Sequence, residues 1–172
     1  KSLKKAVMQK QYMHEQILDI RIACINYQFV AATHRTPATV VGDGKSSIRQ
    51  LIEDENTSGR RGEPYHAQLA FINADAAARY RGSSIDDVLA EGEARTVLGV
   101  ANYGAGGEII DITDDIPQWM IDQSIAASQA VSLPVCGVDF MLSAVPTVDS
   151  TPEEIDPVIV ELNKCPSLAI HD

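Results

Sequence analysis

The sequence has few of the features that mark disulfide-rich, zinc-binding or membrane proteins. It has only three cysteines, Cys24, Cys136 and Cys165, and no C-x-x-C pair. This argues against a disulfide framework or a structural zinc site, and it favours a reducing compartment. Long apolar runs, a signal peptide and lipidation motifs are also missing. We therefore expect a soluble, cytoplasmic protein that does not enter a membrane.

Basic residues are scarce, with 14 Lys and Arg against 24 Asp and Glu and a formal net charge of -10. A surface of this charge repels a phosphate backbone, so we expect no nucleic-acid partner, although a local cluster of Arg and Lys can still bind a small anion. The 172 residues, of which 45% are hydrophobic, predict one domain over 1–172. The sequence leaves open whether the chain forms a homo-oligomer.

Hydrophobic periodicity predicts a mixture of strands and helices. The runs 18–25 and 28–35 are separated by Asn26-Tyr27 and predict a hairpin, with Asp19 and Arg21 on one face of its first strand. The segment that carries Arg60–Gly62 predicts a surface loop. The other predicted elements are helices over 46–55, 74–80, 84–90 and 117–131, and strands over 95–101, 136–142 and 157–163.

The stretch VVGDGKSSIRQL, residues 40–51, has the composition of a phosphate-binding loop. It is not a Walker A motif, because Thr39 stands where that motif needs its first glycine. Two interpretations remain open. The Gly-Asp-Gly turn with Lys45 contacts phosphate, or it is an ordinary strand–turn–helix connection in which Ser46 or Ser47 caps the helix.

Three oxygen-bearing side chains stand near the ends of the last two predicted strands. Asp139 interrupts an apolar strand, and Glu161 and Asn163 share one face of the next because strand side chains alternate with period two. If these strands pair, the three residues form a hard ligand set suited to Mg²⁺. The alternative is that they occupy the solvent face of an antiparallel pair.

Several motifs in a consistent order resemble the ATP-grasp superfamily of carboxylate–amine ligases, as found in cyanophycin synthetases and bifunctional glutathione synthetases. These motifs are DIRIACINYQFVAATHRTPATVVGDGKSSIRQLIEDEN, the RRG of residues 60–62, ANYGAGGEIIDITDDI, CGVDFML and IVELNKCPSLAIH. The resemblance covers residues 7–171. It implies an α+β (α/β) fold, the C-terminal lobe of an ATP-grasp domain, with a mostly antiparallel sheet flanked by helices.

The resemblance also implies roles for individual residues. Mg²⁺ would be held by Asp139, Glu161 and Asn163. The catalytic residues would be Arg21, Arg35 and Asn102, which would contact phosphate or the acyl-phosphate. ATP would be bound by Gln9, Lys10 and Met13 at the adenine, Asp19 at the ribose, Lys45 over the triphosphate, and Gly106 and Gly107 in a loop near the acceptor.

The reaction implied by the resemblance activates a carboxylate with ATP and Mg²⁺ and joins it to an amine, with small amino acids or peptides as substrates. Gly99-Val100 departs from the basic residues that relatives commonly have before the Asn102 loop. Because nothing before Val7 can supply the upstream lobe, we expect a fragment that is inactive by itself. The alternative function is a non-catalytic ATP-grasp-like module for protein association. The histidines, including His34 and His171, are interpreted as structural.

Overall fold

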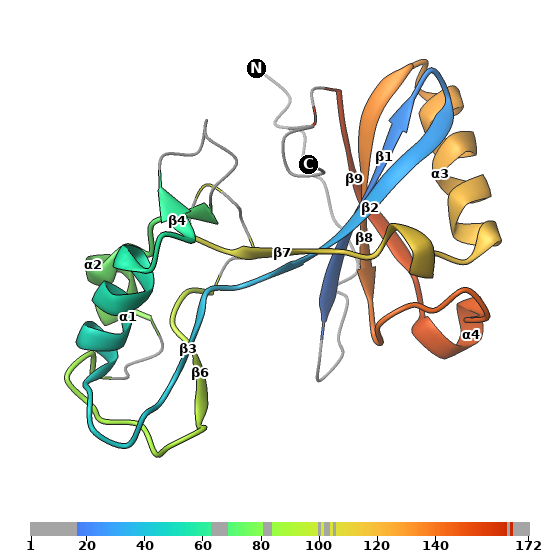
Figure 1. Cartoon of the computed structure of the whole chain (residues 1–172). Coiled ribbons are helices and arrows are strands. Elements are labelled where there is room, and N and C mark those ends of the chain that lie inside the picture. The colour runs from blue at the N-terminus through green and yellow to red at the C-terminus, as the bar shows by residue number, and fades with distance from the viewer. Residues whose placement is uncertain are drawn as a thin grey trace, which may run out of the picture.

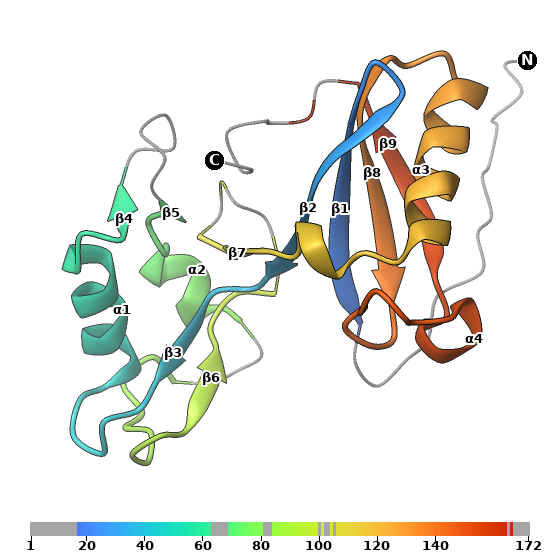
Figure 2. The ribbon, with the colours of Figure 1, turned by 45° about the vertical axis from the view of Figure 1, so that its right-hand side comes forward.

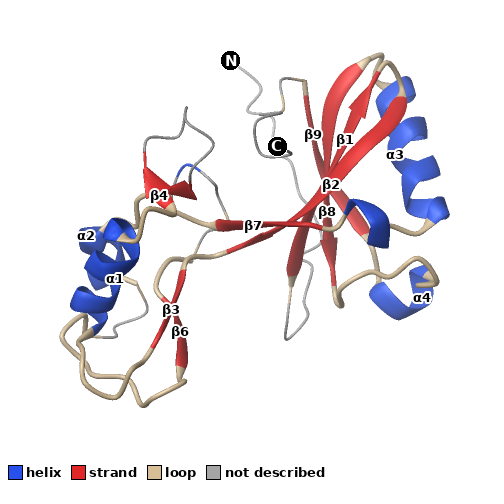
Figure 3. Cartoon of the chain, viewed as in Figure 1, coloured by secondary structure: helices blue, strands red, loops and turns tan. Residues whose placement is uncertain are grey.

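The computed structural model describes residues 17–62, 69–80, 84–99, 101, 104, 106–164 and 166. Strands and helices follow one another along the chain as Figure 3 shows. The strands are β1 (Leu18–Ile25), β2 (Gln28–Thr36), β3 (Thr39–Val41), β4 (Arg61–Gly62), β5 (Leu69–Ala70), β6 (Ala94–Thr96), β7 (Glu108–Asp111), β8 (Val135–Leu142) and β9 (Val158–Asn163). The helices are α1 (Ile48–Thr57), α2 (Ala74–Ala78), α3 (Gln118–Ala130), α4 (Pro152–Ile155) and the 3-10 turn η2 (Thr113–Asp115).

A five-stranded sheet in the order β7-β2-β1-β8-β9 forms the larger part of the structure. All of its neighbouring strands run antiparallel. The predicted β1–β2 hairpin is confirmed, and its turn residues Asn26 and Tyr27 have φ of 51° and 59°. Two successive positive φ values are those of a type I′ turn, whose twist matches that of the flanking strands.

Helix α3 covers one face of this sheet, as Figure 2 shows. The alternate residues Ile20, Ile22, Val138 and Phe140 of β1 and β8 are fully buried against it. Strand alternation therefore sends the intervening residues, which include Arg21, to the opposite face. That face carries the polar side chains described below.

A second hydrophobic cluster lies beside the sheet, where α1 and α2 pack with the β3–β6 pair. In Figure 1 the chain crosses between the two parts along β2 into β3 and returns along β7. Helix α1 begins after Ser47, whose side chain accepts a hydrogen bond from Gln50 N at 3.3 Å, so the predicted serine cap is confirmed. None of the described helices is long and apolar enough to cross a lipid bilayer.

The mostly antiparallel sheet with flanking helices confirms the predicted fold class, but three local predictions are wrong. No helix forms over 84–90, because the carbonyls of Ile85 and Asp87 accept from Arg49 N and Ile48 N at the start of α1. The strand predicted over 95–101 covers only 94–96. Arg61, whose segment was predicted to be a surface loop, is buried, and β7 and α4 form in segments for which no strand or helix was predicted.

Candidate functional site

A row of polar side chains crosses the face of the five-stranded sheet that lies opposite α3. The register pairs Thr33 with both Asp111 and Arg21, Arg21 with Asp139, and Asp139 with Glu161. Directly opposed residues of antiparallel strands point to the same face. The row therefore runs over all five strands, from β7 to β9.

Asp139 lies at the centre of the row and is 3% exposed. Arg21 binds it through two parallel hydrogen bonds, Nε to Oδ1 and Nη2 to Oδ2, both 2.7 Å. Arg35 Nη2 lies 3.2 Å from Oδ2, and Asn163 Nδ2 donates to Oδ2 at 3.0 Å. Arg35 also donates to Asp19 through Nε at 3.1 Å and through Nη2. Burial of Asp139 is thus compensated by donors from three side chains.

The charges of the two arginines in this network offset those of the two aspartates. Burial raises the pKa of Asp19 above its usual value, and the hydrogen bond and charge of Arg35 only partly offset this effect. The hydrogen bond that Arg21 donates to Asp139 raises the pKa of Arg21, so this guanidinium stays charged. Arg21 and Arg35 balance Asp19 and Asp139, and Glu161 then leaves one uncompensated negative charge. The site can therefore take up a cation.

A β-bulge in β9 aims Glu161 into the site. Asp139 pairs with Glu161, but the next residue, Phe140, pairs with Ile159, so Val160 is an extra residue between them. In a regular strand Ile159 and Glu161 would share a face. The bulge instead lets Ile159 pack on the core below α3 while Glu161 and Val160 line the opposite face.

The site opens into a cleft of about 460 Å³. Its lining residues are Asp19, Arg21, Arg35, Ala101, Asp139, Met141, Val160, Glu161 and Asn163.

The chemistry of Asp139, Glu161 and Asn163 fits Mg²⁺, which prefers carboxylate and amide oxygens. Glu161 is exposed, and its side chain makes no hydrogen bond or ion pair with the side chains of the described residues. In the part of the chain that the structure describes, no three His, Cys, Asp or Glu side chains gather as a metal cluster, so the amide of Asn163 would complete this set. Arg21 competes with a cation for Asp139 because it binds both carboxylate oxygens.

The structure brings six of the predicted site residues together in this cleft: Asp19, Arg21, Arg35, Asp139, Glu161 and Asn163. Lys45 does not line it and lies in the loop between β3 and α1. Gly106 and Gly107 are buried just before β7. Gln9, Lys10, Met13 and Asn102 lie outside the described residues. The roles assigned to all of these residues stay predictions.

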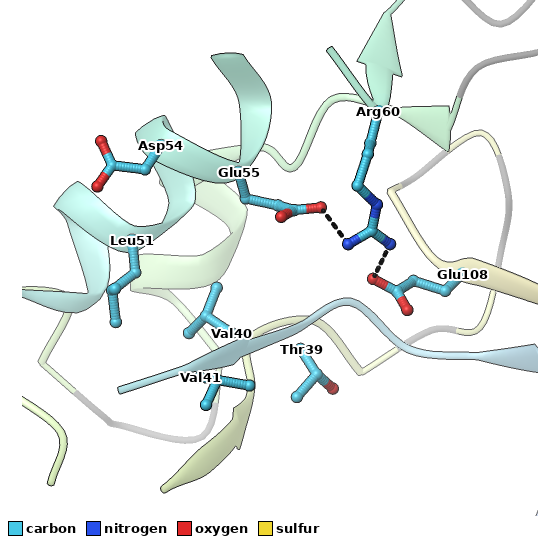
Figure 4. A pocket seen from close by; sticks show the side chains of 8 residues that line it. All are labelled: Thr39, Val40, Val41, Leu51, Asp54, Glu55, Arg60 and Glu108. Carbon is cyan, nitrogen blue, oxygen red and sulfur yellow. Dashed lines mark hydrogen bonds and ion pairs between the residues drawn. The ribbon is translucent and has the colours of Figure 1, made fainter. Parts of the chain in front are cut away.

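A second cleft of about 500 Å³ lies between α1 and β3. Figure 4 shows Arg60 reaching between Glu55 and Glu108, at 3.4 Å from each. The other lining residues are Thr39, Val40, Val41, Leu51 and Asp54. Among the described residues that line it, the cation Arg60 is thus already paired with carboxylates, whereas the sheet-face cleft combines Arg21 and Arg35 with the exposed Glu161.

The sequence did not single out two buried residues, Thr33 and Arg61. Thr33 stands next to Arg21 in the polar row, and the register of β1 and β2 would have revealed it once Asp139 was chosen. Arg61 is buried and donates to Gly106 O at 2.8 Å, and nothing in the RRG stretch signals its burial. His34 alternates with Thr33 onto the other face of β2, where burial lowers its pKa.

Comparison with known proteins relates the chain to two kinds of synthetase, although no protein-family model matches it. It is 34% identical over 160 residues to a cyanophycin synthetase of Crocosphaera subtropica, covering 89% of this chain and 18% of that protein. It is 31% identical over 157 residues to the glutathione biosynthesis bifunctional protein GshAB of Desulfotalea psychrophila, covering 89% of this chain and 20% of that protein. The crystal structure of a bifunctional glutathione synthetase from Pasteurella multocida matches with a TM-score of 0.67 and 25% identity, over 90% of this chain and 21% of that one.

These matches confirm the resemblance predicted from the motifs. The chain is homologous to a segment of cyanophycin synthetases and bifunctional glutathione synthetases, and it has the ATP-grasp fold of that segment. The relatives are ligases. The chain spans about a fifth of the length of the curated relatives it matches, 18% and 20% for the two named.

Proposed function

We propose that this chain supplies the cation- and phosphate-binding part of an ATP-dependent carboxylate–amine ligase. The observation that carries the proposal is the convergence of two arginines, two aspartates, a glutamate and an asparagine in one cleft. Homology to two kinds of synthetase favours a ligase over other phosphate-binding enzymes. Residues 1–172 would be the C-terminal part of an ATP-grasp domain, and we propose that the activity needs the remaining parts that its relatives have.

Charge and geometry support the roles proposed for the residues that line the cleft, and the resemblance to the ligases supports the other roles. Asp139, Glu161 and Asn163 would hold Mg²⁺, which when bound neutralises charge on the phosphates of ATP. Arg21 and Arg35 would bind phosphoryl oxygens, a task that suits a planar guanidinium with several donors. Further contacts to ATP and substrate would come from Asp19 at the ribose, from Lys45, Gly106, Gly107 and Asn102 near the phosphates, and from Gln9, Lys10 and Met13 at the adenine.

The proposed reaction needs positioning and charge neutralisation rather than a nucleophile from the protein. A carboxylate oxygen of the substrate attacks the γ-phosphorus of ATP, and ADP leaves. The amine of the second substrate then attacks the acyl carbon, phosphate leaves, and an amide forms. We propose small amino acids or peptides as both substrates, as the names of the relatives suggest.

The test is calorimetric titration of the full-length protein with ATP, with and without Mg²⁺. We expect Mg²⁺-dependent binding, weakened at least about tenfold by Glu161→Gln, because an oxygen ligand loses its charge. Glu53→Gln is the matched control, since Glu53 is also an exposed carboxylate and lies on α1, in the other part of the structure. Unchanged binding in Glu161→Gln would refute the assigned site. Absence of nucleotide binding in the wild type would favour the non-catalytic association module.

A further inference from the structure

The hydroxyl of Thr33 is buried without a hydrogen-bond partner. Thr33 is 1% exposed, and in the described part of the chain its Oγ1 is the buried side-chain polar atom that lacks a partner. An unpaired buried hydroxyl is destabilising, and such groups are rare in native structures. It therefore calls for an explanation, and its position in the polar row suggests one.

Arg21 lies between two residues that can each accept its N–H groups. In the register of the sheet it is opposed by Asp139 on β8 and by Thr33 on β2. Directly opposed side chains begin about 5 Å apart at Cβ, well within the reach of an arginine. Arg21 uses Nε and Nη2 for Asp139, and none of its N–H groups makes a hydrogen bond to Thr33 in this structure.

A cation at Asp139 competes with this arrangement. Arg21 binds both carboxylate oxygens, and a divalent cation on the same oxygens would repel the guanidinium. This repulsion favours release of Arg21 from Asp139, and Thr33 offers an acceptor on the other side of β1.

We infer that Arg21 exchanges partners on cation binding, moving from Asp139 to the hydroxyl of Thr33. This inference rests on the proposed function, because it needs Mg²⁺ at Asp139, Glu161 and Asn163. Thr33 Oγ accepts one N–H of the guanidinium, and the remaining N–H groups face the phosphoryl oxygens of ATP. Thr33 is thus a positioning residue that acts through Arg21. The exchange couples the binding of the cation to the binding of ATP, since Arg21 becomes available to the phosphates of ATP only when the cation has displaced it from Asp139.

The experiment compares threonine variants of the full-length protein, using Mn²⁺ as the probe in place of Mg²⁺. Free Mn²⁺ is measured by electron paramagnetic resonance, and the melting temperature of the ligand-free protein is measured in parallel. We expect Thr33→Val to bind Mn²⁺ roughly tenfold more weakly, since a hydrogen bond to a charged group is lost. Its ligand-free melting temperature stays equal or rises, because the unpaired hydroxyl is gone.

Two further variants serve as controls on the same strand. Thr33→Ser keeps the hydroxyl and restores Mn²⁺ affinity to near the wild-type value. Thr36→Val makes the same chemical change on the opposite face of β2 and leaves Mn²⁺ affinity unchanged.

Coupling to Arg21 is tested by a double-mutant cycle. Arg21→Met frees Asp139 and tightens Mn²⁺ binding in the absence of nucleotide, and in that background Thr33→Val has no further effect. The inference is overturned if Thr33→Val binds Mn²⁺ as well as the wild type, or if its melting temperature and its affinity fall together as for a merely structural residue. If the wild type binds no Mn²⁺, with or without ATP, the proposed function itself is overturned.

Discussion

Replacing Arg61 with methionine should destabilise the part of the structure around β4 and β7. The Arg61 side chain is fully buried and donates to Ala70 O at 3.0 Å and to Gly106 O at 2.8 Å. Its ion pairs with Glu55 and Glu108 measure 3.1 Å and 3.2 Å, but these glutamates are 21% and 30% exposed and can regain water. The loss therefore comes mainly from two unpaired buried carbonyls, at about 1–3 kcal/mol each.

We expect a total loss of about 3–5 kcal/mol for Arg61→Met, or a melting temperature lower by roughly 10 °C for a protein of this size. The matched control is Arg60→Met, because Arg60 pairs with the same two glutamates but is 58% exposed. Its loss should stay below about 1 kcal/mol. Urea titration measures the loss in the free energy of unfolding, and hydrogen exchange should locate it in β4, β5 and β7. Equal, small losses for both variants would refute the reasoning.

Three further substitutions test the fold. Phe140→Ala should lower the free energy of unfolding by about 3–5 kcal/mol in urea titration, because Phe140 is fully buried beneath α3, and a loss below about 1 kcal/mol would contradict this packing. Gly42→Ala should speed hydrogen exchange in β3 and β6, because the added Cβ would lie 2.3 Å from Ala90 O, and unchanged exchange would contradict this contact. Burial lowers the pKa of His34 below 6.5, so the unfolded chain takes up the proton first as the pH is lowered. The free energy of unfolding therefore decreases as the pH decreases. His34→Gln should flatten the dependence of melting temperature on pH between about pH 7 and pH 5, and an unchanged slope would contradict the burial of His34.

The elements that alternation or helical spacing marks clearly were predictable from sequence. Apolar runs predicted the β1–β2 hairpin, β8 and β9, and helical spacing predicted α3, although the fully buried residues of α3 are Met120, Ser124 and Ser128. The helix predicted over 84–90 failed for a tertiary reason: its backbone carbonyls serve the first turn of α1, and an isolated bridge pairs Val88 with Ser47. Such a use of the backbone leaves no local trace in the sequence.

The site was predictable in its composition but not in its contacts. Alternation alone places Asp19 and Arg21 on one face, and Glu161 and Asn163 on another strand's face. Which carboxylate each arginine binds depends on the register of β1 against β8, and this register is set by packing across the whole sheet. The same holds for Thr33, whose proximity to Arg21 follows from pairing rather than from its neighbours in sequence.

The bulge at Val160 also bears on how the length of this strand can change. Since Phe140 pairs with Ile159 and Asp139 with Glu161, the chain holds one residue more than the register uses. If Val160 were deleted, β9 would become a regular strand, in which Ile159 still packs on the core and Glu161 still faces the cleft. A deletion at Leu162, by contrast, would carry Asn163 to the wrong face, because no surplus residue there absorbs the shift. Homologous strands can thus lose a residue on the N-terminal side of the glutamate without loss of the site, whereas the Glu-x-Asn spacing itself must stay fixed.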